Sequence, residues 1–124
     1  MRPAGVRITR NFDRNLEAIR EFLTELDAPA AFELLLDQLF DEIIPALAEF
    51  PDLGADFFRH PERSREARTR AVQLRRRLGP DTSLRELIHG DFLLLYAHRR
   101  EEIFLLAIRH HRQLSFELLE HWPA

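Results

Sequence analysis

The residues of this sequence that could do chemistry on an anion gather near its C-terminal end, in the run Arg109-His110-His111-Arg112. Guanidinium groups bind phosphate or carboxylate oxygens through paired hydrogen bonds, and a histidine exchanges a proton near neutral pH. The run therefore predicts an anion-binding surface or, with His111 as a general base between Arg109 and Arg112, a catalytic group. Its arginines could equally pair with acidic side chains of this chain, such as Glu117.

Metal and cofactor sites have little support in the sequence. His110 and His111 are adjacent, so on a strand they point to opposite faces and cannot bind the same metal ion. There is no cysteine and no glycine-rich phosphate loop. Every one of the 18 basic residues is an arginine, which leaves no lysine to serve as a base or to form a Schiff base. We therefore expect neither a metal nor a cofactor.

A second group of cations recurs at heptad spacing in a segment, residues 61–78, that reads as a helix. Arg63, Arg70 and Arg77 lie seven residues apart and so share one face of that helix. Such a row is either a solvated helix face or a surface that binds an anion or a partner. Both alternatives stay open at the level of the sequence.

Two polar residues of the predicted strands are further candidates for contact with a partner or target. Arg85 could make such a contact or could form an ion pair with a neighbouring strand. Tyr96 is the only tyrosine and lies within an apolar run, so it is either a contact residue or a core residue with a hydrogen-bonded hydroxyl.

Size and charge indicate one soluble domain, residues 1–124, with an uneven charge distribution. The hydrophobic fraction of 45% and the charged fraction of 31% are typical of a globular chain. Residues 1–54 carry a net charge of −6 and residues 55–83 a net charge of +4. The overall charge of −3 argues against direct nucleic-acid binding by the chain as a whole. No signal peptide or membrane-length apolar run is found, so we expect a cytoplasmic protein that does not contact membranes.

The order of predicted elements is one strand, two helices, a third helix and three strands. Residues 6–9 alternate in polarity as a strand, and two amphipathic helices follow with almost no linker, which predicts an antiparallel hairpin. Pro45 lies inside the second helix and should kink it, because its ring opposes the carbonyl of Asp41. Gly79 and Pro80 should end the third helix. The last strands are predicted at residues 84–89, 92–97 and 103–109.

These elements predict an α+β fold in which the helical hairpin packs on a four-stranded antiparallel sheet that includes the first strand. Residues 55–83 form a helical insertion, and residues 116–122 form a short C-terminal helix. The strands are apolar on both faces, so the sheet face opposite the hairpin must be covered as well. The cover could be the C-terminal helix, the insertion, a second copy or another chain.

Four segments in this order resemble the RelE/ParE superfamily of bacterial type II toxins. They are Phe50-Pro51-Asp52-Leu53-Gly54, the strand Leu84-Arg85-Glu86-Leu87, the strand from Gly90 to Tyr96, and the strand from Ile103 into His110-His111-Arg112-Gln113. The likeness covers about residues 6–54 and 84–116. It implies a small plasmid-stabilising toxin, neutralised in a hetero-oligomer by an antitoxin that lays a tail across its groove and sheet.

The superfamily has two main branches, and the residues favour the one that resembles ParE. RelE-like members cleave messenger RNA on the ribosome with lysines, arginines and a tyrosine near the C-terminus. This chain has no lysine, and Phe116 stands where that tyrosine is expected. ParE-like members inhibit DNA gyrase by binding, without a recognised catalytic set. We therefore predict a binding inhibitor of gyrase, with a RelE-like endoribonuclease and a non-toxic interaction module as the alternatives.

Overall fold

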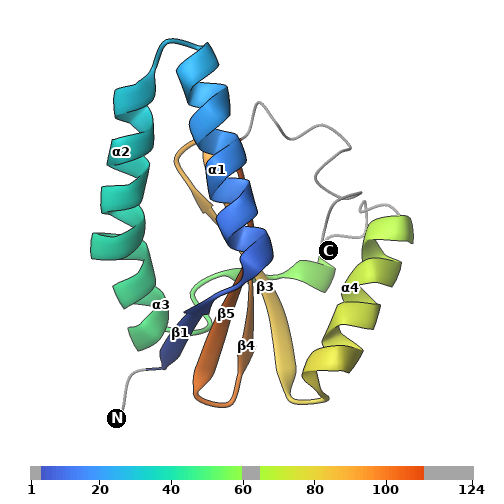
Figure 1. The fold of residues 1–124 in the computed structure, drawn as a ribbon. Helices are drawn as coiled ribbons and strands as arrows, with labels where there is room; N and C mark the ends of the chain where they lie inside the picture. Colours follow the sequence, from blue (N-terminus) through green and yellow to red (C-terminus); the bar gives the residue numbers. More distant parts are fainter. Residues whose placement is uncertain (1–3, 60–64, 111–124) are drawn as a thin grey trace.

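The computed structural model describes residues 4–59 and 65–110 and shows an α+β fold built on one mixed sheet (Figure 1). The strand order is β1-β5-β4-β3-β2, with β1 parallel to β5 and every other pair antiparallel. The strands are β1 (Gly5–Ile8), β2 (Ala55–Asp56), β3 (Thr82–His89), β4 (Phe92–Arg99) and β5 (Glu102–His110).

The sheet therefore has five strands, and the prediction of four was wrong. The additional strand is β2, which pairs with the outer edge of β3 through two residues only. A strand of this length shows no alternation of apolar and polar residues in the sequence. β2 pairs with β3 because the loop before it, which ends at Gly54, is bonded to side chains of β3 and β4. The first strand pairs with a later one, as predicted, but it runs parallel to β5, so the prediction of an antiparallel arrangement was wrong for this pair.

The helical hairpin covers one face of the sheet, as predicted (Figure 1). It consists of α1 (Arg10–Glu25), α2 (Pro29–Gln38), the π-helical turn η1 (Leu39–Ile43) and α3 (Ile44–Glu49). The π turn comes just before Pro45, where the sequence predicts a kink. In that turn the Ile44 amide donates to the carbonyl of Leu39, five residues back. The wider turn is a known response to a residue that does not fit the α-helical ladder.

The start of the hairpin is fixed to β5 by the N-cap residue Thr9 and by two polar side chains of α1. The Thr9 hydroxyl caps α1 and donates to the carbonyl of Leu105 at 2.7 Å. Asn11 donates to the carbonyl of Leu106 at 2.9 Å, and the buried Asn15 accepts from the amide of Ile108 at 3.0 Å. The pairing of β1 with β5 stops at Leu105, close to the point where the pairing of β4 with β5 skips a residue, and these bonds satisfy backbone groups of β5 from there on.

The insertion covers the other face of the sheet. Its helix α4 (Arg65–Leu78) follows the short 3-10 helix η2 (Phe57–Arg59). Phe57, Ala71 and Leu74 are buried against apolar residues of β3, β4 and β5. Gly79, with φ of 107°, ends α4 as predicted, and Arg99 donates to the last helical carbonyl, that of Leu78. The predicted C-terminal helix lies outside the described residues. Within the described part, no helix is long and apolar enough to cross a membrane.

Candidate functional site

A loop between α3 and β2, residues Pro51 to Gly54, is held to the sheet by Tyr96. The Tyr96 hydroxyl donates to the carbonyl of Pro51 and accepts from the amide of Gly54, both at 2.8 Å. The side chain is 0% exposed, and its burial raises the pKa of the hydroxyl above the ordinary value of 10.0. Tyr96 is therefore a core residue with a hydrogen-bonded hydroxyl, and it offers no surface to a partner.

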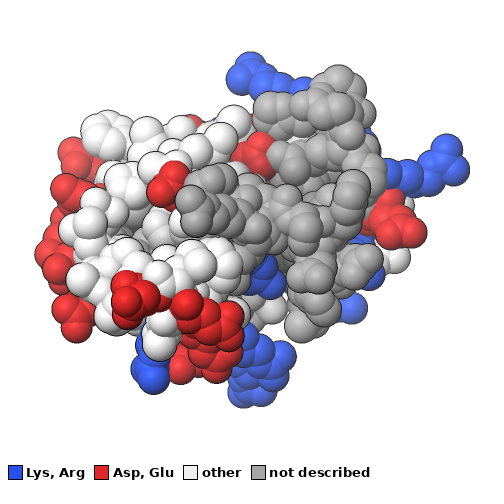
Figure 2. Space-filling view, turned by 90° about the horizontal axis from the view of Figure 1, so that it is seen from above, with Lys and Arg blue, Asp and Glu red and all other residues white. Residues whose placement is uncertain are grey.

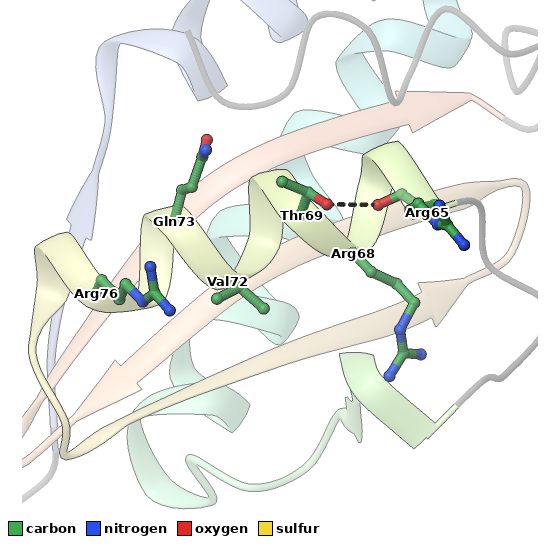
Figure 3. A pocket seen from close by; sticks show the side chains of 6 residues that line it. All are labelled: Arg65, Arg68, Thr69, Val72, Gln73 and Arg76. Atoms are coloured by element: carbon green, nitrogen blue, oxygen red, sulfur yellow. Dashed lines mark hydrogen bonds between the residues drawn. The ribbon is translucent and has the colours of Figure 1, made fainter.

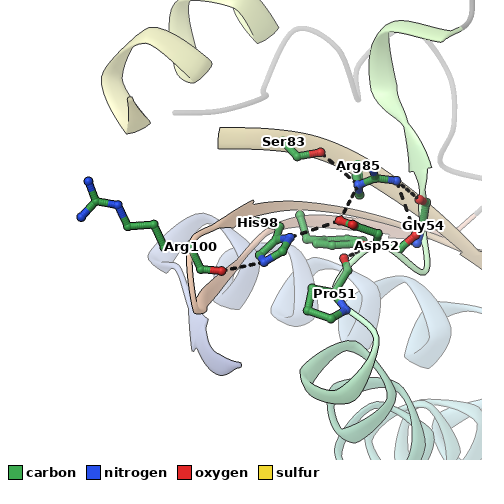
Figure 4. Close-up of polar contacts among 8 residues, drawn as sticks. Pro51, Asp52, Gly54, Ser83, Arg85, His98 and Arg100 are labelled. Atoms are coloured by element: carbon green, nitrogen blue, oxygen red, sulfur yellow. Dashed lines mark hydrogen bonds and ion pairs between the residues drawn. The ribbon is translucent and has the colours of Figure 1, made fainter. Parts of the chain in front are cut away.

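Arg85, opposite Tyr96 on the neighbouring strand, holds the same loop through its guanidinium group (Figure 4). It donates to the carbonyl of Gly54 at 2.7 Å and to the hydroxyl of Ser83 at 3.0 Å. Its Nε lies 3.2 Å from the carboxylate of Asp52. An ion pair with a neighbouring strand was one of the two alternatives for Arg85, and the structure shows an ion pair with the loop instead. These contacts use much of the donor capacity of Arg85.

His98 completes this cluster, which we call the loop clamp: Asp52, Gly54, Arg85, Tyr96 and His98. One imidazole nitrogen, Nδ1, lies 3.1 Å from the Asp52 carboxylate, and the other, Nε2, lies 2.8 Å from the carbonyl of Arg100. Both ring nitrogens are therefore engaged within the protein. His98 and Asp52 were not among the residues predicted to form a site. The strand alternation, which places His98 on the same face as Tyr96, was the signal available.

Gly54 is the tightest point of the clamp. A Cβ added there would lie 2.6 Å from the carbonyl oxygen of Glu86 and 2.8 Å from a ring carbon of Tyr96. The loop backbone can approach the sheet this closely only because the residue has no side chain. This explains physically why a glycine ends the Phe50–Gly54 segment on which the resemblance partly rested.

The end of β5 carries two of the four residues of the cationic run. The imidazole of His110 is buried between the rings of Phe22 and Phe92, with centroids 5.4 and 5.1 Å away. It lines a hollow of about 240 Å³ between the hairpin and the turn from β3 to β4. Arg109 is half-buried and, as its neighbour on a strand, points to the opposite face. The two described members of the run therefore do not form one site. His111 and Arg112 lie outside the described residues.

The outward side of α4 carries most of the remaining candidate cations. Six arginines and one glutamate lie on its 14 residues. Arg70 and Arg77 border a hollow of about 150 Å³ together with Gln73 and Leu74, so the structure brings these two predicted residues together. Arg63, the third of that row, lies outside the described residues. A larger open hollow, of about 500 Å³, is lined by Arg65, Arg68, Thr69, Val72, Gln73 and Arg76 (Figure 3).

The sequence of the chain matches the model of a known protein family. The family model described as the ParE toxin of the type II toxin-antitoxin system parDE matches residues 6–115. The chain belongs to the ParE toxin family. No curated protein matches the chain closely enough to count as a relative. Family membership makes the protein a toxin of a type II system and implies an antitoxin as its partner.

The surface of this ParE-family toxin is divided by charge. Exposed carboxylates gather over the helical hairpin and basic groups over the side that carries α4 (Figure 2). On α2 and η1 the exposed acidic residues are Glu33, Asp37, Asp41 and Glu42. An anionic partner is therefore attracted to α4 and repelled by the hairpin, and a cationic partner has the opposite preference.

Proposed function

We propose that this ParE-family toxin arrests growth by binding DNA gyrase in the cytoplasm, without cleaving a substrate, and that an antitoxin neutralises it by direct binding. Family membership supports the toxin part of this proposal. The polar side chains of the sheet that form the loop clamp hold the fold together, and this supports the binding part.

The observation that carries the proposal is the commitment of the loop clamp to the fold. General acid-base catalysis needs a group that can reach the substrate and exchange a proton with it. The hydroxyl of Tyr96 is buried and holds the backbone at Pro51 and Gly54. Both ring nitrogens of His98 have partners within the protein. These side chains stabilise a rigid surface, which is what a binding inhibitor requires.

The test is inducible expression of the chain alone in bacteria, with plasmid supercoiling and messenger RNA integrity measured on the same samples. Purified toxin is then added to a gyrase supercoiling assay, with and without its cognate antitoxin. We expect loss of supercoiling, intact transcripts and full relief by the antitoxin.

Two other results would replace the proposal with one of the alternatives. Cleaved transcripts with unchanged supercoiling would make the chain an endoribonuclease that relies on Arg109, His111 and Arg112. Harmless expression without the antitoxin, together with no effect on gyrase, would make it an interaction module.

A further inference from the structure

The outward side of α4 is not needed to attach this helix to the sheet. Attachment comes from the inward residues Ala71 and Leu74, which are buried against the strands. Arg75 lies over the ring of Phe58, with its guanidinium carbon 4.7 Å from the centroid, and so helps to hold η2. Arg65 and Arg76, in contrast, are exposed and have no acidic partner within the described residues.

Keeping these cations together has an electrostatic cost. Arg65 and Arg68 are one turn apart, where like charges repel. Arg65 also stands in the first turn of α4, where the helix dipole disfavours a positive charge. Glu66, in the same turn, offsets part of the dipole cost, but no carboxylate of the described residues forms an ion pair with Arg65. A partner that supplies a carboxylate to Arg65 would reduce both costs.

The shape of the hollow indicates a protein partner. Its middle is formed by the half-buried Val72 and by Thr69, and arginines stand at both ends (Figure 3). Arg65 and Arg76 are eleven residues apart, so they are separated by roughly 16 Å along the helix axis. The Thr69 hydroxyl is already bonded to the carbonyl of Arg65 at 2.9 Å. An apolar centre between two cationic ends fits an amphipathic segment better than a phosphate backbone, which has no apolar group to place on Val72.

We propose that this side of α4, the surface formed by Arg65, Arg68, Thr69, Val72, Gln73 and Arg76, binds an acidic amphipathic helix of the antitoxin. The bound segment spans about three helical turns. It places a small apolar residue over Val72 and carboxylates at its two ends, against Arg65 and Arg76. This inference rests on the proposed neutralisation by an antitoxin and names the surface at which it occurs.

The insertion determines what a partner meets on this side of the sheet. The sheet face opposite the hairpin is already covered by Phe57, Ala71 and Leu74 of the same chain. A partner that approaches from this side therefore meets the arginines of α4 and not an apolar sheet. Binding at this surface should depend strongly on salt, because it rests on exposed charges.

The experiment measures the affinity of the full-length toxin for synthetic peptides that tile its cognate antitoxin, at low and at high salt. The test variant is Arg65→Glu/Arg76→Glu. The matched control is Arg10→Glu/Arg14→Glu, which makes the same charge change at two exposed positions of α1. We expect one acidic peptide to bind, the α4 variant to bind it at least 30-fold more weakly, and the control to bind it as the wild type does. Reversing the matching carboxylates of the peptide to arginine should restore affinity for the α4 variant.

Equal affinity of the wild type and the α4 variant for the antitoxin would overturn the inference and leave the proposed function standing. Failure of the full-length antitoxin to bind or neutralise the wild-type toxin would overturn the proposed function itself. If a short DNA duplex bound the α4 surface and no peptide did, the surface would be a nucleic-acid contact, and the inference would be wrong.

Discussion

The loop clamp and the outward side of α4 use the same residue type in opposite ways. In the clamp, the Arg85 side chain is 22% exposed and its donors face Gly54, Ser83 and Asp52. On α4, Arg65 and Arg76 are exposed and border a hollow. An arginine whose donors are satisfied inside the chain stabilises the fold, whereas one held in place without a partner is available to bind. Mutations in the clamp should therefore affect folding, and mutations on α4 should affect association.

The largest effect on folding is expected at the tightest point of the clamp. Gly54→Ala places a Cβ 2.6 Å from the carbonyl of Glu86, which is backbone and cannot move aside easily. We expect the free energy of unfolding to fall by about 3 kcal/mol, measured by urea denaturation. The variant should be less stable, but its folded molecules should bind the antitoxin with the affinity of the wild type.

The matched control for this change is Gly90→Ala. Gly90 has a φ of 57°, and nothing lies within 4 Å of an added Cβ. Only backbone strain then opposes the alanine, at about 1 kcal/mol. Equal losses at the two glycines would show that the loop is not closely packed against Tyr96, and the contrast between the clamp and α4 would fail.

A somewhat smaller effect is expected for Tyr96→Phe. The change leaves the Gly54 amide and the Pro51 carbonyl without their buried partner, at about 2 kcal/mol. Burial raises the pKa of Tyr96, so above pH 10 the unfolded state loses this proton before the folded state does. The unfolded state then binds fewer protons, and stability falls as pH rises above about 10.

The phenylalanine variant lacks this ionisation, which gives the prediction an internal control. Because Tyr96 is the only tyrosine, no other phenol contributes. The difference in unfolding free energy between the wild type and Tyr96→Phe should therefore narrow as pH rises above 10. A constant difference between pH 8 and pH 11, measured by urea denaturation, would mean that the hydroxyl is solvated.

The clamp also shows which part of the site can be read from a sequence. Periodicity gives the hairpin and the three long strands, because apolar spacing directly reflects burial. The end of α4 at Gly79 comes from the conformational preferences of Gly79 and Pro80. Periodicity cannot give the two-residue strand β2 or the partners of Asp52 and His98. These depend on how a loop lies across strands that are distant in the chain. For the same reason, the two open alternatives for Tyr96 were settled by its surroundings and not by its type.

A smaller decrease in the free energy of unfolding, of about 1 kcal/mol, is expected when the ion pair of the clamp is removed. Arg85→Gln and Asp52→Asn each break the contact at 3.2 Å, whose partial exposure keeps its contribution to stability low. Arg85→Gln also removes the bond to the Gly54 carbonyl, so it should cost more than Asp52→Asn. The double variant should cost less than the sum of the two single variants, because each removes the same interaction. Additive losses in urea denaturation would contradict the pairing. An affinity for the antitoxin that falls more than the folded fraction does would make Arg85 a contact residue after all.

The smallest effect on folding is expected on α4, where the largest effect on association is predicted. Arg65→Gln removes a cation from the first turn of the helix and should raise the free energy of unfolding by up to about 0.5 kcal/mol. Arg76→Gln removes one from the last turn and should lower it by a similar amount. The double variant should then unfold at the same urea concentration as the wild type. A loss above about 1.5 kcal/mol would show that these arginines hold the fold together, as Arg85 does, and the distinction between the two clusters would collapse.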